Sequence, residues 1–204
     1  MSPKVSEEYK QERKKELIKA ARSVFIEKGY VHTSMQDIMD KAEISRGAFY
    51  SYFDNIDHVF IEVLKFDDDE DVQYFMSSNE GPIWPQLKRW VEEQQYQIES
   101  INQTLVYAKA EFFLSSKNKV NFPYIAERYN QTADAIEKVL IEGVRKGEFK
   151  PQQPTRSIAM YLISFINGLM LDSFQLGHEQ TNVKDQLSVF LFSLERLINP
   201  IHTK

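Results

Sequence analysis

The side chains best suited to bind another molecule lie close together between positions 45 and 52. Arg46 can reach a phosphate or a guanine base, and the hydroxyls of Tyr50 and Tyr52 can donate hydrogen bonds to phosphates. Gly47 and Ala48 are too small to hold a backbone away from a groove. The chemistry that this group of residues indicates is hydrogen bonding to nucleic acid.

Two short helices are expected to position these side chains. Ser34 is a good N-cap for the first helix, and Asp37 occupies the position of its partner in a capping box. Ser45 is the corresponding N-cap of the second helix. One apolar stripe is predicted on the first helix from its spacing: Met35, Ile38, Met39 and Ala42.

In the second helix, Ile44 and Phe49 have the spacing of a hydrophobic staple, and Phe49 and Phe53 are expected to point inward. Arg46, Gly47 and Tyr50 then lie on the outward face. The segment 33–53 therefore predicts a helix-turn-helix that reads DNA. A surface helical hairpin without a ligand remains the alternative if periodicity alone is considered.

Composition limits the other possibilities. The chain has 204 residues, 42% of them hydrophobic, and contains no cysteine, so disulfides and thiolate chemistry are excluded. The N-terminus is charged from Lys4 onward, and the longest uncharged stretch, residues 157–171, is shorter than the roughly 20 residues that span a bilayer. We expect an all-α protein in the cytoplasm that has no contact with a membrane.

The distribution of charge is more informative than its total of −5. Residues 1–56 contain ten Lys and Arg against nine Asp and Glu, a net charge of +1, whereas the remainder has a net charge of −6. A nearly neutral head on an acidic body predicts local phosphate contact without a broad basic surface. The lysines and arginines near the N-terminus also fit a solvated helix face that alternates with glutamates.

The organisation along the chain predicts a head and a larger body. A first long helix carries an inner stripe and stops at Gly29, and another helix begins near Asp57 and runs into the acidic residues 67–71. We interpret that acidic run as a solvated connector in preference to a metal site. The predicted domains are residues 1–56, a connecting helix and loop at 57–80, and residues 81–204.

The helical pattern continues over residues 84–100, 101–116, 122–145, 156–176 and 183–198. Apolar residues lie on more than one face of the last two helices, so both helices must be covered on two sides. This favours a homodimer built as a four-helix bundle from these helices. A pair of central core helices in one chain is the alternative.

The N-terminal residues resemble the TetR family of bacterial transcriptional repressors. The resemblance runs from Arg13 to Phe60, and a weaker one covers Gly143 to Gly168. The residues that carry it are Leu17, Ile18, Ala20, Ala21, Phe25, Gly29, Tyr30, Thr33, Ile38, Ala42, Ile44, Ser45, Arg46, Gly47, Phe49, Tyr50, Tyr52 and Phe53.

The resemblance implies an N-terminal three-helix helix-turn-helix DNA-binding domain and a larger C-terminal helical domain for ligand binding and dimerisation. It implies that operator DNA and a small effector are the partners, and that no cofactor or metal takes part. By position, the implied DNA contacts are Thr33, Ser34, Gln36, Ser45, Arg46, Gly47, Ala48, Tyr50 and Tyr52.

Two positions depart from the family pattern. Glu43 stands where the family often has glycine, so we expect a slightly different turn geometry. Ile56 stands where a lysine is usual, which removes a phosphate contact. Asp54 nearby adds an unfavourable charge, and Asn55 is expected to compensate in part for the lost contact. These changes predict a shallower salt dependence of DNA binding.

The effector is expected among aromatic and polar side chains of the middle helices: Trp90, Tyr107, Glu111, Phe112, Tyr129, Phe165 and Asn167. Such a pocket suits a hydrophobic or planar compound. Glu111 interrupts an apolar run, and a buried carboxylate needs a partner, for which a cationic ligand is one candidate. Ordinary core packing, or a solvent-facing Glu111, is the alternative.

Other functional classes have little support in the sequence. The four histidines are far apart, and neither a Gly-rich phosphate loop nor a GxSxG motif is present, so an enzyme is not expected. An α-helical adaptor that binds only protein remains an alternative, although it would not need the small residues that begin the second helix.

Overall fold

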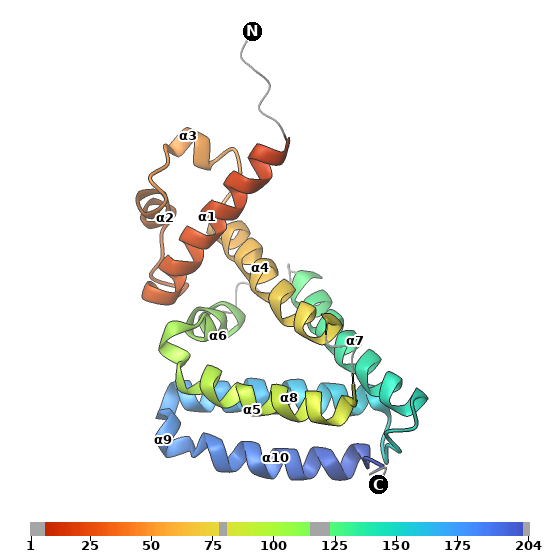
Figure 1. Cartoon of the computed structure of the whole chain (residues 1–204). Coiled ribbons are helices and arrows are strands. Elements are labelled where there is room, and N and C mark those ends of the chain that lie inside the picture. Colours follow the sequence, from red (N-terminus) through yellow and green to blue (C-terminus); the bar gives the residue numbers. More distant parts are fainter. Residues whose placement is uncertain (1–6, 78–80, 115–122, 202–204) are drawn as a thin grey trace. The chain divides into compact units, whose positions relative to one another are not determined.

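The structure is a computed structural model that describes residues 7–77, 81–114 and 123–201, with only the backbone for residues 69–77 and 102 (Figure 1). Within these ranges every regular element is a helix, apart from an isolated antiparallel bridge between Phe149 and Pro200. The predicted all-α class is confirmed. The elements are α1 (Glu7–Lys28), α2 (Met35–Lys41), α3 (Arg46–Phe49), α4 (Ile56–Ser77), α5 (Ile83–Glu99), the 3-10 helix η1 (Ile101–Gln103), α6 (Val106–Leu114), α7 (Pro123–Arg145), α8 (Thr155–Leu176), α9 (His178–Thr181) and α10 (Val183–Ile198).

The chain forms two compact units. The first consists of Met1–Asp69 and Tyr107–Val120, and the second of Glu70–Val106 and Asn121–Lys204. This division differs from the boundaries predicted at residues 56 and 80. Nearly all of α6 joins the first unit, and the division falls within α4, because apolar residues of both helices are buried in the core of the head.

An aromatic cluster forms the centre of the first unit. The Phe25 and Phe60 ring centroids are 4.7 Å apart, and Tyr30 lies 5.1 Å from Phe60 and 5.0 Å from Phe112. The predicted inner stripe of the first helix is confirmed, because the side chains of Leu17, Ala21, Val24 and Phe25 are all buried. Gly29 ends this helix with a φ of +75°, a backbone conformation that favours glycine.

The acidic run continues α4, and its first residue is not solvated as the sequence indicated. The carboxylate of Asp67 lies 3.0 Å from Arg22 and 2.7 Å from Lys109. Burial alone would raise the pKa of Asp67, but Lys109 and Arg22 outweigh it and hold that pKa below its usual value. Two cations thus make a carboxylate acceptable in a half-buried position. The side chains of Asp69, Glu70 and Asp71 lie outside the described residues.

The second unit has its own apolar core, to which α5, α7, α8 and α10 all contribute. By length and composition alone α8 is apolar enough to cross a membrane. Six of its residues are buried in this core, and the helix contacts α5, α7, α9 and α10. This packing accounts for one face of the helix, whereas Met160 and Tyr161 remain exposed.

Several local details differ from the expectations. Residues 101–116 do not form one helix, since the short η1 and a turn precede α6. The last long helices begin one residue from the expected place or at it: α8 starts at Thr155, whose hydroxyl donates to the Glu137 carboxylate, with Pro154 at the N-cap. The short helix α9 was not predicted. Other predicted helix and loop boundaries fell at residues 6, 79–80, 115–116 and 122. These positions lie outside the described residues.

Candidate nucleic-acid interface

The predicted capping box at the start of α2 is confirmed. The Ser34 hydroxyl accepts a hydrogen bond from the Asp37 amide at 3.2 Å, and the Asp37 carboxylate accepts one from the Ser34 amide at 2.9 Å. Lys28, from the last turn of α1, lies 2.6 Å from the same carboxylate. The hydrogen bond from Lys28, together with those from Ser34, lowers the pKa of Asp37 to about 2.

This shift predicts a pH dependence of stability. Because the pKa of Asp37 is lower in the folded state than in the unfolded chain, its contribution is present above the unfolded value near 4 and is lost as pH falls toward 2. We expect Asp37→Asn to flatten the fall in unfolding free energy between about pH 4 and pH 2. Urea denaturation of both proteins across this range measures it, and parallel pH profiles would contradict the role of Asp37.

Glu43 adopts the left-handed conformation in the turn between α2 and α3, with a φ of +49°. Its amide donates to the Asp40 carbonyl at 3.3 Å, and the Ile44 amide donates to the Met39 carbonyl at 3.1 Å. These two bonds form a Schellman motif, in which the position of Glu43 is usually occupied by glycine. The expectation of an altered turn is therefore wrong. The turn has the left-handed conformation that glycine favours, and Glu43 adopts it at a steric cost.

Glu43→Gly is expected to raise the free energy of unfolding by about 1 kcal/mol, because it removes the steric cost of a left-handed residue that has a Cβ. The gain is reduced by the greater freedom of glycine in the unfolded chain. Urea denaturation provides the measurement, and Glu43→Ala is the matched control, which keeps the Cβ and should give no such gain. An equal gain in both variants would point to the lost charge as its cause.

The recognition helix α3 begins at its predicted cap. The Ser45 hydroxyl accepts from the Ala48 amide at 3.4 Å. The α-helical part is shorter than predicted and gives way to tight turns that end with the Phe53 amide bonded to the Phe49 carbonyl. Phe49 and Phe53 are 0% and 1% exposed, with ring centroids 5.1 Å apart, so the prediction that both point inward is confirmed.

Four of the predicted contact residues share the outward face of α3. Ser45, Arg46, Gly47 and Ala48 are exposed, and the Arg46 guanidinium lies 5.5 Å from the ring centroid of Tyr50, which is itself exposed. Among the described residues, no atom would lie within 4 Å of a Cβ placed on Gly47. This face is open and carries hydrogen-bond donors, as a groove-reading helix requires.

The other predicted contacts are placed differently. The Thr33 side chain is buried, and its hydroxyl donates to the Gly29 carbonyl. Ser34 is exposed but acts as the cap of α2, and the Gln36 amide lies 2.7 Å from the Asp40 carboxylate. Tyr52 is half-buried. The structure therefore brings Ser45 to Ala48 and Tyr50 together, whereas Thr33 turns inward.

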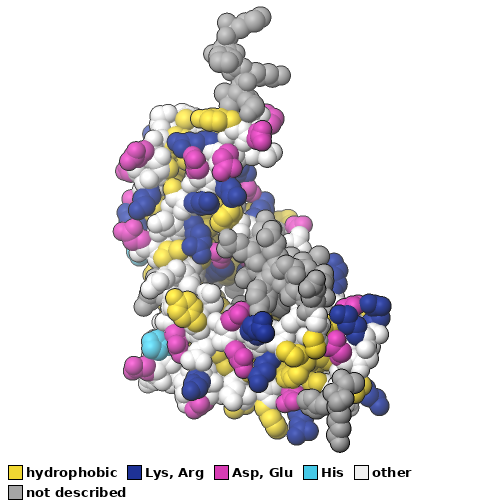
Figure 2. All heavy atoms as spheres, viewed as in Figure 1, with side chains coloured by type: hydrophobic (Ala, Val, Ile, Leu, Met, Phe, Trp, Pro, Cys, Tyr) yellow, Lys and Arg dark blue, Asp and Glu magenta, His cyan; other side chains and the backbone are white. Residues whose placement is uncertain are grey.

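The head has the mixed charge that the sequence predicted. On the face shown in Figure 2, the Lys and Arg side chains of the first unit intermingle with Asp and Glu. Lys14, for example, lies 2.5 Å from Glu62. Asn55, expected to compensate in part for the missing phosphate contact, is exposed, and its side-chain oxygen accepts a hydrogen bond from the His58 amide at the start of α4.

The residues predicted to bind an effector fall into two groups. In the second unit, Trp90, Tyr129 and Phe165 are partly buried against its core, Phe165 stacks on Phe190 at 4.2 Å, and Asn167 is exposed. The other three, Tyr107, Glu111 and Phe112, lie on α6 in the first unit. Four of the seven residues thus belong to the second unit and three to the first.

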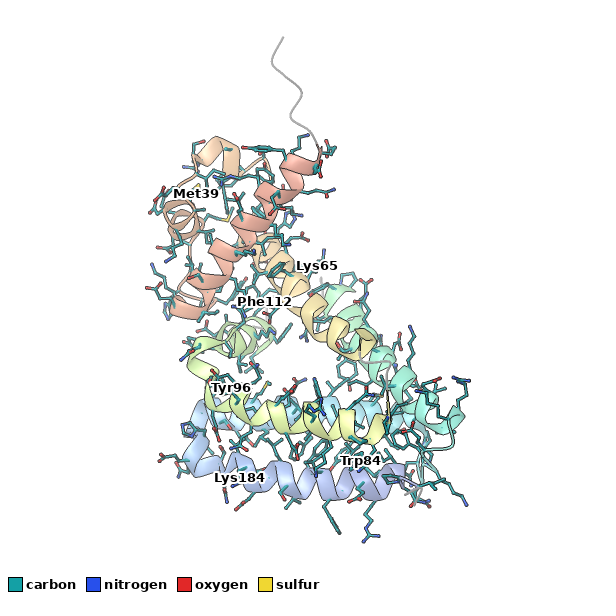
Figure 3. All side chains as sticks on the ribbon, viewed as in Figure 1. Met39, Lys65, Trp84, Tyr96, Phe112 and Lys184 are labelled. Atoms are coloured by element: carbon teal, nitrogen blue, oxygen red, sulfur yellow. The ribbon has the colours of Figure 1, made fainter. Side chains whose placement is uncertain are left out.

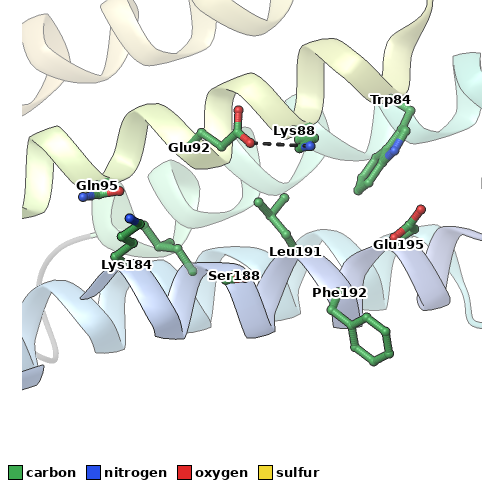
Figure 4. A pocket seen from close by; sticks show the side chains of 10 residues that line it. Trp84, Lys88, Glu92, Gln95, Lys184, Ser188, Leu191, Phe192 and Glu195 are labelled. Atoms are coloured by element: carbon green, nitrogen blue, oxygen red, sulfur yellow. Dashed lines mark ion pairs between the residues drawn. The ribbon is translucent and has the colours of Figure 1, made fainter. Parts of the chain in front are cut away.

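A groove in the second unit lies between α5 and α10 (Figure 4). Its volume is about 610 Å³, and the Lys88 ammonium lies 3.7 Å from Glu92 on its wall. Apolar and charged side chains of both signs line it: Trp84, Lys88, Glu92, Gln95, Lys184, Leu187, Ser188, Leu191, Phe192 and Glu195. None of these residues was predicted from the sequence, because α5 and α10 meet only in the fold.

Comparisons with known proteins agree with this architecture. Residues 17–63 match the model of bacterial regulatory proteins of the tetR family, and residues 86–184 match that of the tetracyclin repressor-like C-terminal domain. The uncharacterized HTH-type transcriptional regulator YfiR of Bacillus subtilis (strain 168) is 28% identical over 90% of both chains. The HTH-type transcriptional repressor DhaR of Mycobacterium sp. (strain GP1) is 26% identical over 76% of this chain and 79% of its own.

The same fold occurs in the reduced form of E. coli NemR, with a TM-score of 0.76, 14% identity, and coverage of 94% of this chain and 100% of that one. A capped helix-turn-helix with an open recognition face, joined to a helical body, defines a DNA-binding transcriptional regulator. The chain belongs to the TetR family of bacterial transcriptional regulators. Members of this family bind operator DNA and small-molecule effectors, act as dimers and are not enzymes.

Proposed function

We propose that this protein is a homodimeric repressor that leaves its operator when a small molecule binds to the second unit. The observation that carries the DNA-binding part is the outward face of α3, where Arg46, Gly47 and Tyr50 are accessible while Phe49 and Phe53 anchor the helix. Such a regulator works in the cytoplasm, where bacterial DNA is found, and needs no contact with a membrane.

The outward faces of α8 and α10 are proposed to form the dimer. Met160 and Tyr161 on α8 are exposed, as are Val189 and Phe192 on α10, and the two helices contact each other. Exposed apolar residues on neighbouring helices are typical of an interface. Paired with a second copy, the two helices would make a four-helix bundle and bury these side chains.

Release from DNA follows from the geometry of such a dimer. Two recognition helices reach successive turns of the major groove only when they lie about 34–36 Å apart, or a multiple of that distance. An effector that binds better to a form with a different spacing shifts the population toward that form. A coupling of about 1–3 kcal/mol changes operator affinity roughly 5- to 150-fold.

The proposed effector site uses the predicted residues that lie in the second unit, namely Trp90, Tyr129, Phe165 and Asn167. Three aromatic rings partly buried against the core suit a hydrophobic or planar compound. A cationic compound is the alternative, since aromatic faces also attract cations. The groove between α5 and α10 is a second candidate site, because its volume lies in the range of ligand pockets.

The two tryptophans of the chain allow a direct test, because both lie on α5. Both pack against the core, but only Trp84 also lines the groove. Compounds that raise the melting temperature are titrated into Trp84→Phe and Trp90→Phe variants, each of which keeps one tryptophan. If the site lies beside Trp90, fluorescence changes in Trp84→Phe only, and the same compound releases operator DNA in a gel shift.

Two results would contradict the proposed function. The first is that the wild type binds DNA from its own upstream region no more tightly than random DNA at physiological salt. The second is that compounds which bind the protein never release it from that DNA. A fluorescence change confined to Trp90→Phe would instead assign the effector to the α5–α10 groove.

A further inference from the structure

Helix α6 is an integral part of the first unit, although more than 30 residues separate it from the end of the head in sequence. Phe112, labelled in Figure 3, lies on this helix. Ala108 and Phe112 are 0% exposed, and the Phe112 ring centroid lies 4.9 Å from that of Phe60. On the same helix, the Lys109 ammonium lies 2.7 Å from the Asp67 carboxylate. These contacts fix α6 against α4.

From this helix, Glu111 reaches the turn that joins α1 to α2. Its Oε2 accepts a hydrogen bond from the Val31 amide at 2.9 Å. A Cβ placed on Gly29 would lie 2.6 Å from that oxygen and 2.6 Å from the ring of Tyr107. The positive φ favours glycine at position 29, and a Cβ there would also displace the side chains of Glu111 and Tyr107.

The turn leads directly into the helix-turn-helix. The Thr33 hydroxyl donates to the Gly29 carbonyl at 2.5 Å, and Ser34, the next residue, caps α2. Glu111 thus holds the middle of a five-residue segment whose two ends are fixed by the close of α1 and the start of α2. Glu111 also hydrogen-bonds the Tyr107 hydroxyl, which raises the pKa of Tyr107 and ties the carboxylate to its own helix.

We propose that Glu111 is a positioning residue for DNA binding, which holds residues 29–33 so that α2 and α3 are presented to the operator in a fixed orientation. Its partner is a backbone amide of this chain in place of the cationic ligand considered from the sequence. The role needs an oxygen acceptor and not a negative charge. The C-terminal end of α1 is itself partially negative, so the charge of a carboxylate gains nothing there. Any side chain with an oxygen acceptor at this reach should serve.

Three variants test the proposal by fluorescence anisotropy with operator DNA. Glu111→Ala is expected to lower operator affinity about 10-fold, the ratio that corresponds to the loss of one hydrogen bond to a charged group. Glu111→Gln keeps an oxygen acceptor and is expected to stay within about 2-fold of the wild type. Lys109→Met is the matched control, since it removes an α6 ion pair but leaves the turn untouched, and it too should stay near wild type.

Each alternative role gives a different result. If Glu111→Ala and Lys109→Met weaken operator binding equally, the effect belongs to α6 docking in general and the proposal is overturned. It is also overturned if both Glu111 variants bind operator normally and lose only the response to an effector, since Glu111 is then a ligand-binding group. Thermal melts of all three variants establish that they are folded.

Hydrogen exchange at the Val31 amide gives a second measurement that needs no DNA and does not depend on Glu111→Ala folding. Exchange should be slow in the wild type and in Glu111→Gln, and faster in Glu111→Ala if that variant folds. Fast exchange of this amide in the wild type would overturn the proposal.

Discussion

Replacing Gly47 with leucine is expected to lower operator affinity about 1000-fold, to the level of non-specific binding, while the protein stays folded. Gly47 lies on the outward face of α3 between Arg46 and Ala48, where a backbone can come close to a groove. A leucine side chain would hold the whole helix away from the base edges. Direct readout by the neighbouring side chains would then be lost together with the contact at position 47.

The free protein gives no reason for a glycine at this position. In the part of the chain that the structure describes, no atom would contact an added Cβ, and the φ of Gly47 is not in the left-handed region. Glycine within a helix costs roughly 0.5–1 kcal/mol relative to alanine. Gly47→Leu should therefore leave the melting temperature unchanged or raise it, which separates a DNA-contacting role from a structural one.

Glu27→Leu is the matched control, because it places the same side chain on an exposed position of α1. Operator affinity is compared by fluorescence anisotropy at physiological salt, and folding by thermal melts. Gly47→Ala should lie between wild type and Gly47→Leu, since it adds only one methyl group. If Gly47→Leu binds operator as tightly as the wild type, α3 does not approach DNA through this face.

The parts of the head that could be predicted from sequence depend on residues a few positions apart. Both N-caps, the capping box and the inward Phe49 and Phe53 follow from spacings of three or four residues, and the structure has all of them. The left-handed Glu43 could not be predicted in this way. Glutamate carries no signal for a positive φ, and only the surrounding bonds of the Schellman motif force it.

Contacts between distant segments explain the remaining differences. Asp67 was interpreted from the acidic character of its neighbours, but Arg22 and Lys109, each more than 40 residues away, neutralise it. Glu111 bonds a backbone amide 80 positions earlier, and a backbone amide has no side-chain identity that a sequence pattern could reveal. Helical periodicity identified α6 as apolar without indicating which core would receive it.

Phe192→Glu is expected to convert the protein to a monomer and to lower operator affinity by about 100-fold or more. Phe192 is 60% exposed on α10, and the Arg196 guanidinium lies 5.3 Å from its ring centroid. A carboxylate at this place would lose its water in the proposed dimer, a cost that pairing with Arg196 offsets only in part, whereas in the monomer both charges stay in water. The loss on DNA follows because linking two heads makes the second binding event intramolecular.

Ile141→Glu is the matched control, since it puts the same charge on an exposed apolar position of α7 outside the proposed interface. Sedimentation at micromolar concentration and anisotropy with operator should show a dimer with normal affinity for this variant. Gly168→Leu is a second variant at the proposed interface. Among the described residues, a Cβ added to Gly168 on α8 has no neighbour within 4 Å, as was found for Gly47. If Gly168→Leu and Phe192→Glu both remain dimers, the interface lies elsewhere and does not account for the glycine at position 168.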